Sequence, residues 1–444
     1  MTRRRGRPLA IALLATAGLL AGCTGGPARP AVPPPPSAAT PASVVSGCLL
    51  PPASCYAPRL FQVAYGIQSL LDQGINGSGE TVTVVDPVLP YTGVSSSASS
   101  PDAGPAAAEI RRDLTAFDSE FRLAAPQVQV VTSLSGPTSS AQATYAEVQE
   151  LEVVHAVAPA ATLRVVLLPS NVQGSAATAT AGMLAGLRLA VSGTGVAVIG
   201  WSLGEHFFTR AQAAQMQSIL LGAQARHVTV IAGSGDNGGF SAAPFGGTAV
   251  TEVSLPAASP LVLAVGGTTL TASTLTGAYT SETTWNGDAD TPTTIGASGG
   301  GFSHLYTRPA YQAGVPRTAA MRSVPDVAGD ADPNSGASIL SVSGGTTGDA
   351  PAAGTGAAAA LWAGLIALAD QYARHDLGLV NPAIYRIARG PSYHRAFHDV
   401  TAGSNVQTQP YPGGTSGYTA GPGWDPATGW GSPNAQVLVP LLAA

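Results

Sequence analysis

The stretch that most constrains the fold of this chain is Gly354-Thr355-Gly356-Ala-Ala-Ala-Ala-Leu-Trp-Ala-Gly-Leu-Ile-Ala-Leu-Ala369. From residue 357 onward, a helix with this sequence is apolar on almost every side, and such helices are buried. The small residues before it predict a turn whose free backbone N–H groups lie at the positive end of the helix dipole. Such a turn suits a nucleophile and a developing oxyanion, but this turn contains no serine.

Short apolar segments alternate with helical segments through the first half of the chain. The predicted strands are Thr81–Val85, Val128–Val131, Leu163–Leu168, Val196–Ile199, Val228–Ile231 and Leu261–Val265. The predicted helices are Ala107–Phe121, Tyr145–Val157, Ala176–Val191 and Arg210–Arg226. This alternation predicts an α/β fold with a mostly parallel central sheet, its strands buried on both faces beneath helices. From about Ser281 onward the sequence is rich in glycine and predicts a less regular structure.

Composition excludes several functional classes. The chain has 444 residues, of which 10% are charged, and all its basic side chains except histidine are arginine. Without lysine it cannot use Schiff-base or serine–lysine chemistry. A net charge of -5, with no basic cluster past the N-terminus, argues against nucleic acid as a partner.

The first residues have the pattern of an export signal. Arg3–Arg5 form a basic segment, Leu9–Leu20 form a short apolar segment, and Leu20-Ala-Gly-Cys23 resembles the lipidation motif of bacterial lipoproteins. We therefore expect residues 1–22 to be a signal peptide and Cys23 to attach the exported protein to the membrane by lipid. The alternative is an ordinary signal peptide followed by an unmodified cysteine.

A proline-, alanine- and serine-rich tether follows over residues 23–47, and one large domain is expected over residues 48–444. If Cys23 is lipidated, Cys48 and Cys55 remain as an even pair outside the cytoplasm. We expect them to form a disulfide around a short loop. No sizeable segment resembling an inhibitory prodomain lies between the tether and this domain.

Several short segments, taken in order, identify a resemblance that covers the chain from about Tyr56 to its C-terminus. They are Ala64-Tyr-Gly-Ile67, His155-Ala-Val-Ala-Pro159, Ser234-Gly-Asp236, Ser298-Gly-Gly-Gly-Phe-Ser303, Arg308-Pro309, Val324-Pro-Asp-Val327, Ala331-Asp-Pro333, Asp399-Val-Thr401 and Gly421-Pro-Gly-Trp-Asp425. The sequence resembles the sedolisins, serine-carboxyl peptidases with a subtilisin-like fold. The resemblance implies a subtilisin-like α/β sandwich that forms a single large domain.

The resemblance also implies a set of catalytic positions, and this chain departs from the family at most of them. The family uses a serine nucleophile, a glutamate base, an aspartate that supports the base and a second aspartate at the oxyanion. Gly356 occupies the nucleophile position, Ala146 the base position and Glu150 the supporting position, while Asp236 retains the oxyanion acid. Glu147 lies beside the base position, but one step along a helix rotates its side chain by roughly 100°.

A calcium site of the family matches more closely. The resemblance implies that Asp399, the Val400 carbonyl, Gly421, Gly423 and Asp425 hold one structural Ca2+. Two carboxylates and several carbonyl oxygens suit a hard cation. The alternative is an Asx turn and a glycine-rich loop without metal. The seven histidines show no metal-ligand spacing.

These residues predict an inactive relative of a serine peptidase. Gly200–Gly204 and Ala297–Gly301 resemble the segments that line the family's peptide cleft, so the partner is expected to be an extended peptide or an envelope protein. Two alternatives remain open. One is an active peptidase built on Glu147, Glu150 and Asp236 with another nucleophile, and the other is a purely structural envelope protein.

Overall fold

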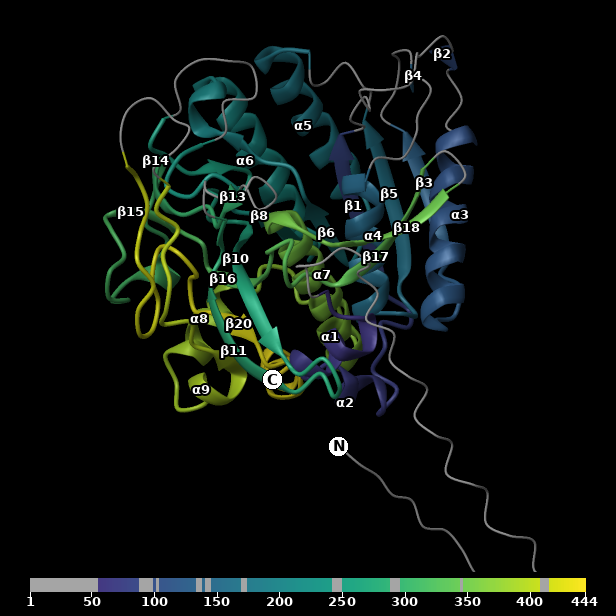
Figure 1. The fold of residues 1–444 in the computed structure, drawn as a ribbon. Helices are drawn as coiled ribbons and strands as arrows, with labels where there is room; N and C mark the ends of the chain where they lie inside the picture. Colours follow the sequence, from purple (N-terminus) through teal and green to yellow (C-terminus); the bar gives the residue numbers. More distant parts are fainter. Residues whose placement is uncertain are drawn as a thin grey trace, which may run out of the picture. The chain divides into compact units, whose positions relative to one another are not determined.

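The computed structural model of the chain describes residues 55–87, 99–100, 104–132, 138–139, 145–168, 174–241, 250–287, 296–343, 346–407 and 415–444. A central eight-stranded sheet runs through these residues, with its main strands in the order β11-β10-β8-β6-β1-β5-β3 and with β16 paired to β10 (Figure 1). The strands are β1 Thr81–Pro87, β3 Val128–Thr132, β5 Thr162–Leu168, β6 Val196–Ile199, β8 Thr229–Gly233, β10 Leu263–Ala272, β11 Tyr279–Thr284 and β16 Val327–Asp330.

All pairings in this sheet are parallel except that of β11 with β10. All six strands predicted from the apolar segments belong to it; five match within two residues at each end, and β10 continues to Ala272, beyond the predicted end at Val265. The sequence did not predict β11 and β16. Strand β16 includes Gly329 and Asp330 and so lacks a continuous apolar run, and β11 alternates with an exposed polar face that lacks the continuous apolar pattern of the other strands.

Helices cover both faces of the sheet, as predicted. They are α1 Pro58–Ala64, α2 Gln68–Leu71, α3 Gly104–Phe121, α4 Tyr145–Val157, α5 Ala176–Ala190, α6 Arg210–Ala225, α7 Gly354–Ala373, α8 Asn381–Ala388, α9 Tyr393–Ala396 and α10 Ala435–Leu442. One core lies between the sheet and α4, α7 and α10, and a second lies between the sheet and α5 and α6. Alternate residues of single strands enter the two cores, for example Val84 and Val85 of β1, so the strands are buried on both faces.

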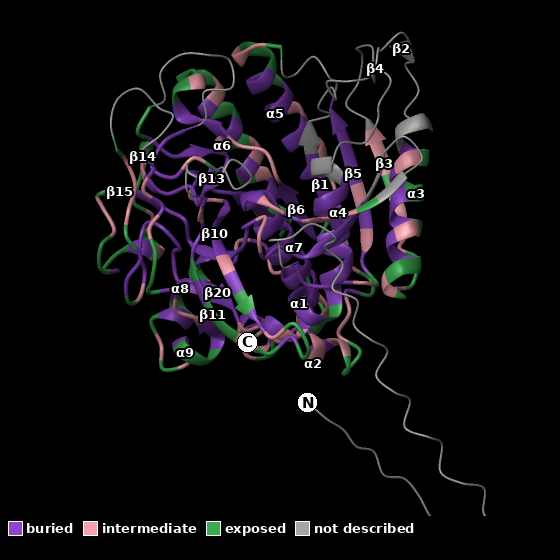
Figure 2. Cartoon of the chain, in the orientation of Figure 1, coloured by how far each residue is buried: buried purple, intermediate pink, exposed green. Residues whose placement is uncertain are grey.

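Helix α7 is buried over most of its length (Figure 2). Every residue from Gly354 to Asp370 is buried, and the helix packs against β6, β8, β10, β16, α4 and α10. The helix begins at Gly354, so the predicted turn is its first turn. Gly364 allows a close approach to α4, because a Cβ atom there would lie 2.6 Å from Val157.

Shorter strand pairs lie outside the central sheet, and from Asn286 onward they make the glycine-rich part of the chain more regular than the sequence predicted. The short pairs are β2 Ser99–Ser100 with β4 Thr138–Ser139, β7 Leu203–Gly204 with β9 Ser254–Leu255, β12 Asn286–Gly287 with β13 Gly296–Ala297, β14 Gly301–Thr307 with β15 Met321–Val324, β17 Ser338–Ser343 with β18 Thr346–Pro351, and β19 Phe397–His398 with β20 Ser432–Pro433. Two 3-10 turns, η2 Glu205–Phe207 and η3 Ala310–Gln312, complete the described elements.

The predicted signal peptide, Cys23, the tether and Cys48 lie outside the described residues. Cys55 is buried and disulfide-bonded. Among the described helices, none combines the length and the apolar composition that crossing a membrane requires.

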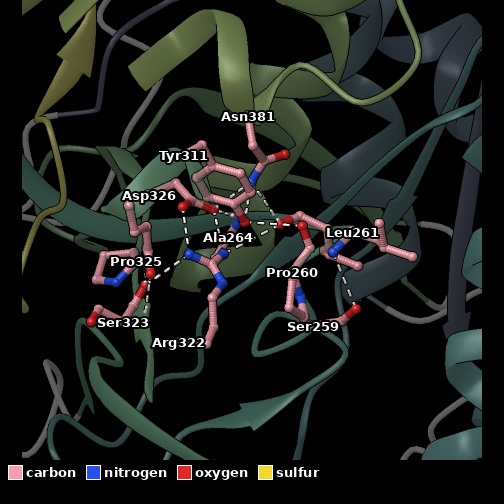
Figure 3. Close-up of polar contacts among 12 residues, drawn as sticks. Ser259, Pro260, Leu261, Ala264, Tyr311, Arg322, Ser323, Pro325, Asp326 and Asn381 are labelled. Carbon is pink, nitrogen blue, oxygen red and sulfur yellow. Dashed lines mark hydrogen bonds and ion pairs between the residues drawn. The ribbon is translucent and has the colours of Figure 1, made fainter. Parts of the chain in front are cut away.

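A buried ion pair ties the β15–β16 turn to β10 and α8 (Figure 3). Arg322 donates from both terminal nitrogens to the two carboxylate oxygens of Asp326, each at 2.6 Å, and both side chains are fully buried. Asp326 also accepts hydrogen bonds from the Ala264 N–H at 2.9 Å, the Asn381 amide at 3.0 Å and the Tyr385 hydroxyl at 2.9 Å. The carboxylate is therefore the centre on which four segments of the chain converge.

Replacing Arg322 by leucine is expected to lower the free energy of unfolding by about 3–5 kcal/mol, because the buried Asp326 would lose the arginine with which it pairs. Chemical denaturation followed by circular dichroism measures the change. Arg386→Leu, on the exposed side of α8, is the control and should change stability by no more than about 0.5 kcal/mol. Equal losses in the two variants would show that the Arg322–Asp326 pair does not support the fold.

Candidate functional site

Four segments that are far apart in the sequence meet at the carboxyl ends of β6 and β8. Gly200 follows β6, Asp236 follows β8, Gly356 lies in the first turn of α7, and Glu150 projects from α4. In parallel sheets, ligand sites gather at this edge. The structure therefore brings together three of the four predicted catalytic positions, Glu150, Asp236 and Gly356.

The carboxylate of Glu150 occupies the space beside Gly356. A Cβ atom built on Gly356 would lie 2.5 Å from Glu150 Oε1 and 3.1 Å from the Gly200 carbonyl oxygen. A Cβ atom on Gly200 would lie only 1.5 Å from the same Oε1 atom. Glu150 itself is buried, with 2% of its surface exposed. The two glycines thus form the walls between which the Glu150 carboxylate fits, where the family has a serine side chain.

Asp236 is bound to the first turn of α7. Its Oδ1 atom accepts hydrogen bonds from the Thr355 N–H at 2.8 Å and from the Thr355 hydroxyl at 2.7 Å. The same hydroxyl accepts a bond from the Gly235 N–H at 3.1 Å. Thr355 is buried, so its hydroxyl faces Asp236 rather than a substrate.

Surrounding protein raises the pKa of Asp236, and the two bonds from Thr355 oppose the rise. Solvent still reaches this exposed side chain, which limits the effect. Asp236 is therefore the one predicted catalytic carboxylate in contact with both solvent and the helix terminus.

The predicted base position and its neighbour stay undecided. Ala146 and Glu147 lie on α4, but their side chains are outside the described residues.

The two predicted cleft segments differ in how their backbones are used. Trp201 and Ser202 are partly exposed, belong to no strand, and take no part in the turn and loop backbone hydrogen bonds of the described residues. By contrast, the Gly299 N–H donates to the Gly235 carbonyl at 2.6 Å and the Gly300 N–H donates to the Gly238 carbonyl at 3.2 Å. The Ala297–Gly301 segment thus holds the Asp236 loop in place, and the first segment has backbone groups available for a ligand.

The residues predicted to bind calcium lie together in the C-terminal loops. The Gly423 N–H donates to both oxygens of Asp399 at 3.1 Å, and the Gly421 N–H donates to Asp425 Oδ2 at 3.0 Å. Burial raises the pKa of Asp425 to about 6, against several hydrogen bonds from its own loop. In the described part of the chain, no donor bonds to the carbonyl oxygens of Val400, Gly421 or Gly423.

One cluster of possible ligands was missed by sequence reasoning. Glu205, Glu252 and His304 each place one ligand atom within 4.8 Å of the others. Intervals of 47 and 52 residues separate them, so no local spacing signals the group. The histidines, considered alone, gave no metal-ligand pattern, because the two partners of His304 are carboxylates from distant loops.

The profile of the Subtilase family matches residues 136–390. Kumamolisin from Bacillus sp. (strain MN-32) is 35% identical over 345 residues, which are 74% of this chain and 57% of kumamolisin. Sedolisin from Pseudomonas sp. (strain 101) is 38% identical over 216 residues, which are 47% of this chain and 34% of that protein. The chain thus spans little more than half of the first relative and about a third of the second.

A solved structure agrees with the fold. The structure titled as Pseudomonas sedolisin, a serine-carboxyl proteinase complexed with two molecules of pseudo-iodotyrostatin, superposes with a TM-score of 0.69. It is 26% identical in sequence, and the match covers 87% of this chain and 98% of that one.

Replacing Gly356 by serine is expected to destabilise the protein by about 1–3 kcal/mol, because the new Cβ atom would press on the Glu150 carboxylate. Glu150→Asp withdraws that carboxylate by one methylene group. The double variant should therefore be more stable than the sum of the two single changes predicts, by about 0.5–3 kcal/mol. Denaturant unfolding of the four proteins measures this coupling.

Gly364→Ala is the matched control, because Gly364 lies on the same helix and faces Val157 of α4 rather than Glu150. Combined with Glu150→Asp it should give additive losses. Additivity for Gly356→Ser as well would mean that Glu150 does not occupy the space beside Gly356.

Proposed function

The chain belongs to the subtilase family and, within it, to the sedolisins, and from this premise we propose that it is a catalytically inactive, exported lipoprotein that binds extended peptide segments. Its fold is that of a serine peptidase.

The observation that supports inactivity most strongly is at Gly356. Acyl-enzyme chemistry needs a side-chain nucleophile activated by a neighbouring base. Gly356 has no side chain, and the Glu150 carboxylate fills the adjacent space. Residue 356 therefore supplies no hydroxyl group for the Glu150 carboxylate to support.

Other hydroxyl groups near the site have different environments. Thr355 is buried and bonded to Asp236. Ser202 is partly exposed, and its Oγ atom lies 3.5 Å from the position of a Cβ atom on Gly235. Ser202 is therefore the residue to examine for the second candidate function, an active peptidase with a relocated nucleophile.

Peptide binding is supported by the backbone of Trp201 and Ser202. A partly exposed segment whose N–H and C=O groups bond to no turn or loop backbone of the described residues can accept a peptide as an added strand. The Trp201 side chain is partly exposed beside it and offers an apolar surface to the peptide. We propose an extended segment of a peptide or of an envelope protein as the partner.

We also propose one structural Ca2+ held by Asp399, Asp425 and the carbonyl oxygens of Val400, Gly421 and Gly423. The set fits a hard cation: two carboxylates lie on one loop system beside three carbonyl oxygens to which no described donor bonds. The ion would supply a cross-link between the Asp399 segment and the Gly421–Asp425 loop. Anchoring to the membrane rests on the export pattern and Cys23, and stays a proposal.

The test of inactivity compares the full chain with an Ala146→Glu, Glu150→Asp, Gly356→Ser triple variant. Both proteins are purified in detergent with calcium and incubated with a denatured protein from acid to neutral pH. The natural chain is expected to produce no cleavage, because it has no nucleophile at residue 356. The triple variant is expected to gain cleavage, because the family's three groups are restored. Peptide fragments are counted by mass spectrometry.

Cleavage by the natural chain that persists through repurification would overturn the proposal, and Ser202→Ala would then show whether Ser202 is the nucleophile.

Binding of unlabelled peptides in mild acid is measured on the same preparations through tryptophan fluorescence. No binding by the natural chain would contradict the peptide-binding role and favour a structural envelope protein.

Chelation of calcium is expected to lower the melting temperature of the natural chain. A ligand present at a hundredfold its dissociation constant contributes about 2.7 kcal/mol of stability. Asp399→Asn should melt near the chelated natural protein and respond little to added calcium. Identical melting of the natural chain with and without a chelator would contradict the proposed ion.

A further inference from the structure

A second group of side chains, Glu205, Glu252 and His304, lies just beyond the two predicted cleft segments. Glu205 opens η2 directly after β7, and Glu252 precedes β9, the partner strand of β7. His304 lies on β14, which continues from the Ala297–Gly301 segment. Two chain regions that are separate in sequence therefore meet through these three side chains.

The two carboxylates are buried close together without a strong cation. Glu205 is 2% exposed and Glu252 is 6% exposed. No arginine forms an ion pair with either carboxylate within the described residues, and the chain has no lysine. The His206 imidazole contacts Glu252, and buried carboxylates whose oxygens lie within 4.8 Å of each other are stabilised by a further cation.

The group is already held in place by hydrogen bonds. Glu205 accepts from the Ser303 hydroxyl and, at 2.7 Å, from the His304 N–H. Glu252 accepts from the His206 N–H at 3.2 Å and contacts His206 Nδ1. Each carboxylate oxygen has more than one lone pair, so these bonds leave room for coordination.

We propose that Glu205, Glu252 and His304 bind a divalent transition-metal ion, Zn2+ in the first instance. Two carboxylate oxygens and one imidazole nitrogen are ligands that zinc accepts, whereas calcium and magnesium prefer oxygen alone. Tetrahedral bonds of about 2.0–2.2 Å place ligand atoms about 3.4 Å apart. The present separations, within 4.8 Å, need only small side-chain rotations to reach that arrangement.

The exposure of the histidine supports this assignment. His304 is exposed, so a metal ion can reach the two buried carboxylates from solvent, and a water molecule can fill the fourth position. His206 contacts the proposed ligand Glu252, and outer-shell contacts of this kind orient metal ligands. The bound ion would fasten the β7–β9 pair to β14. The site uses none of the residues assigned to peptide or calcium binding.

The experiment titrates Zn2+ into the full chain in detergent at pH 7.5, after chelation and with excess calcium present. Competition with a chromophoric chelator should give one bound equivalent. His304→Ala should weaken binding by at least about tenfold, since even outer-shell changes have effects of 10–100-fold. His394→Ala, an exposed histidine outside the cluster, should bind as the natural chain does.

Further measurements distinguish binding at this cluster from binding elsewhere. Co2+ in place of zinc should give the visible absorption of a four-coordinate site, and His304→Ala should lose it. Glu252→Gln, which retains an acceptor for His206, should also bind more weakly, and melting curves without metal check that each variant is folded. Asp376→Asn tests the separate acidic group of Glu80, Asp370 and Asp376 and should leave zinc binding unchanged. No stoichiometric zinc binding, or equal binding by His304→Ala and His394→Ala, would overturn the proposal.

Discussion

Burial of α7 is the constraint on which the rest of the fold depends. A helix without a polar face must be surrounded, and here one side is covered by the sheet and the other by α4 and α10. The close approach of α4 is possible because Gly364 has no side chain to meet Val157. This packing fixes where the first turn of α7 lies, at the carboxyl ends of β6 and β8.

The same packing explains how the site stays folded with glycine at residue 356. Thr355 binds Asp236 through both its N–H and its hydroxyl, so the first turn of α7 remains attached to the loop after β8. The longer Glu150 side chain extends to the glycine at residue 356 and fills the space beside it. Glu150 and Gly356 therefore complement each other sterically, and the core around them stays packed.

Local patterns predicted most of the secondary structure because apolar strands and helices have strong periods. They failed at β16, whose four residues include Gly329 and Asp330, and at β11, whose polar face is exposed. The predicted catalytic positions Glu150, Asp236 and Gly356 do meet in space. The contact of Glu150 with Gly200 and Gly356 was not predictable, because the reach of a side chain depends on how closely two helices pack.

By itself the sequence determined the α/β class, the order of the main elements and the absence of a serine at residue 356, because each depends on local composition and spacing. The tertiary structure alone decided that the Glu150 carboxylate lies between two glycines, that Asp326 joins four segments, and that Glu205, Glu252 and His304 converge. Those contacts join residues 4 to 206 positions apart. They form only when the sheet, its covering helices and the glycine-rich loops pack together, which no local pattern encodes.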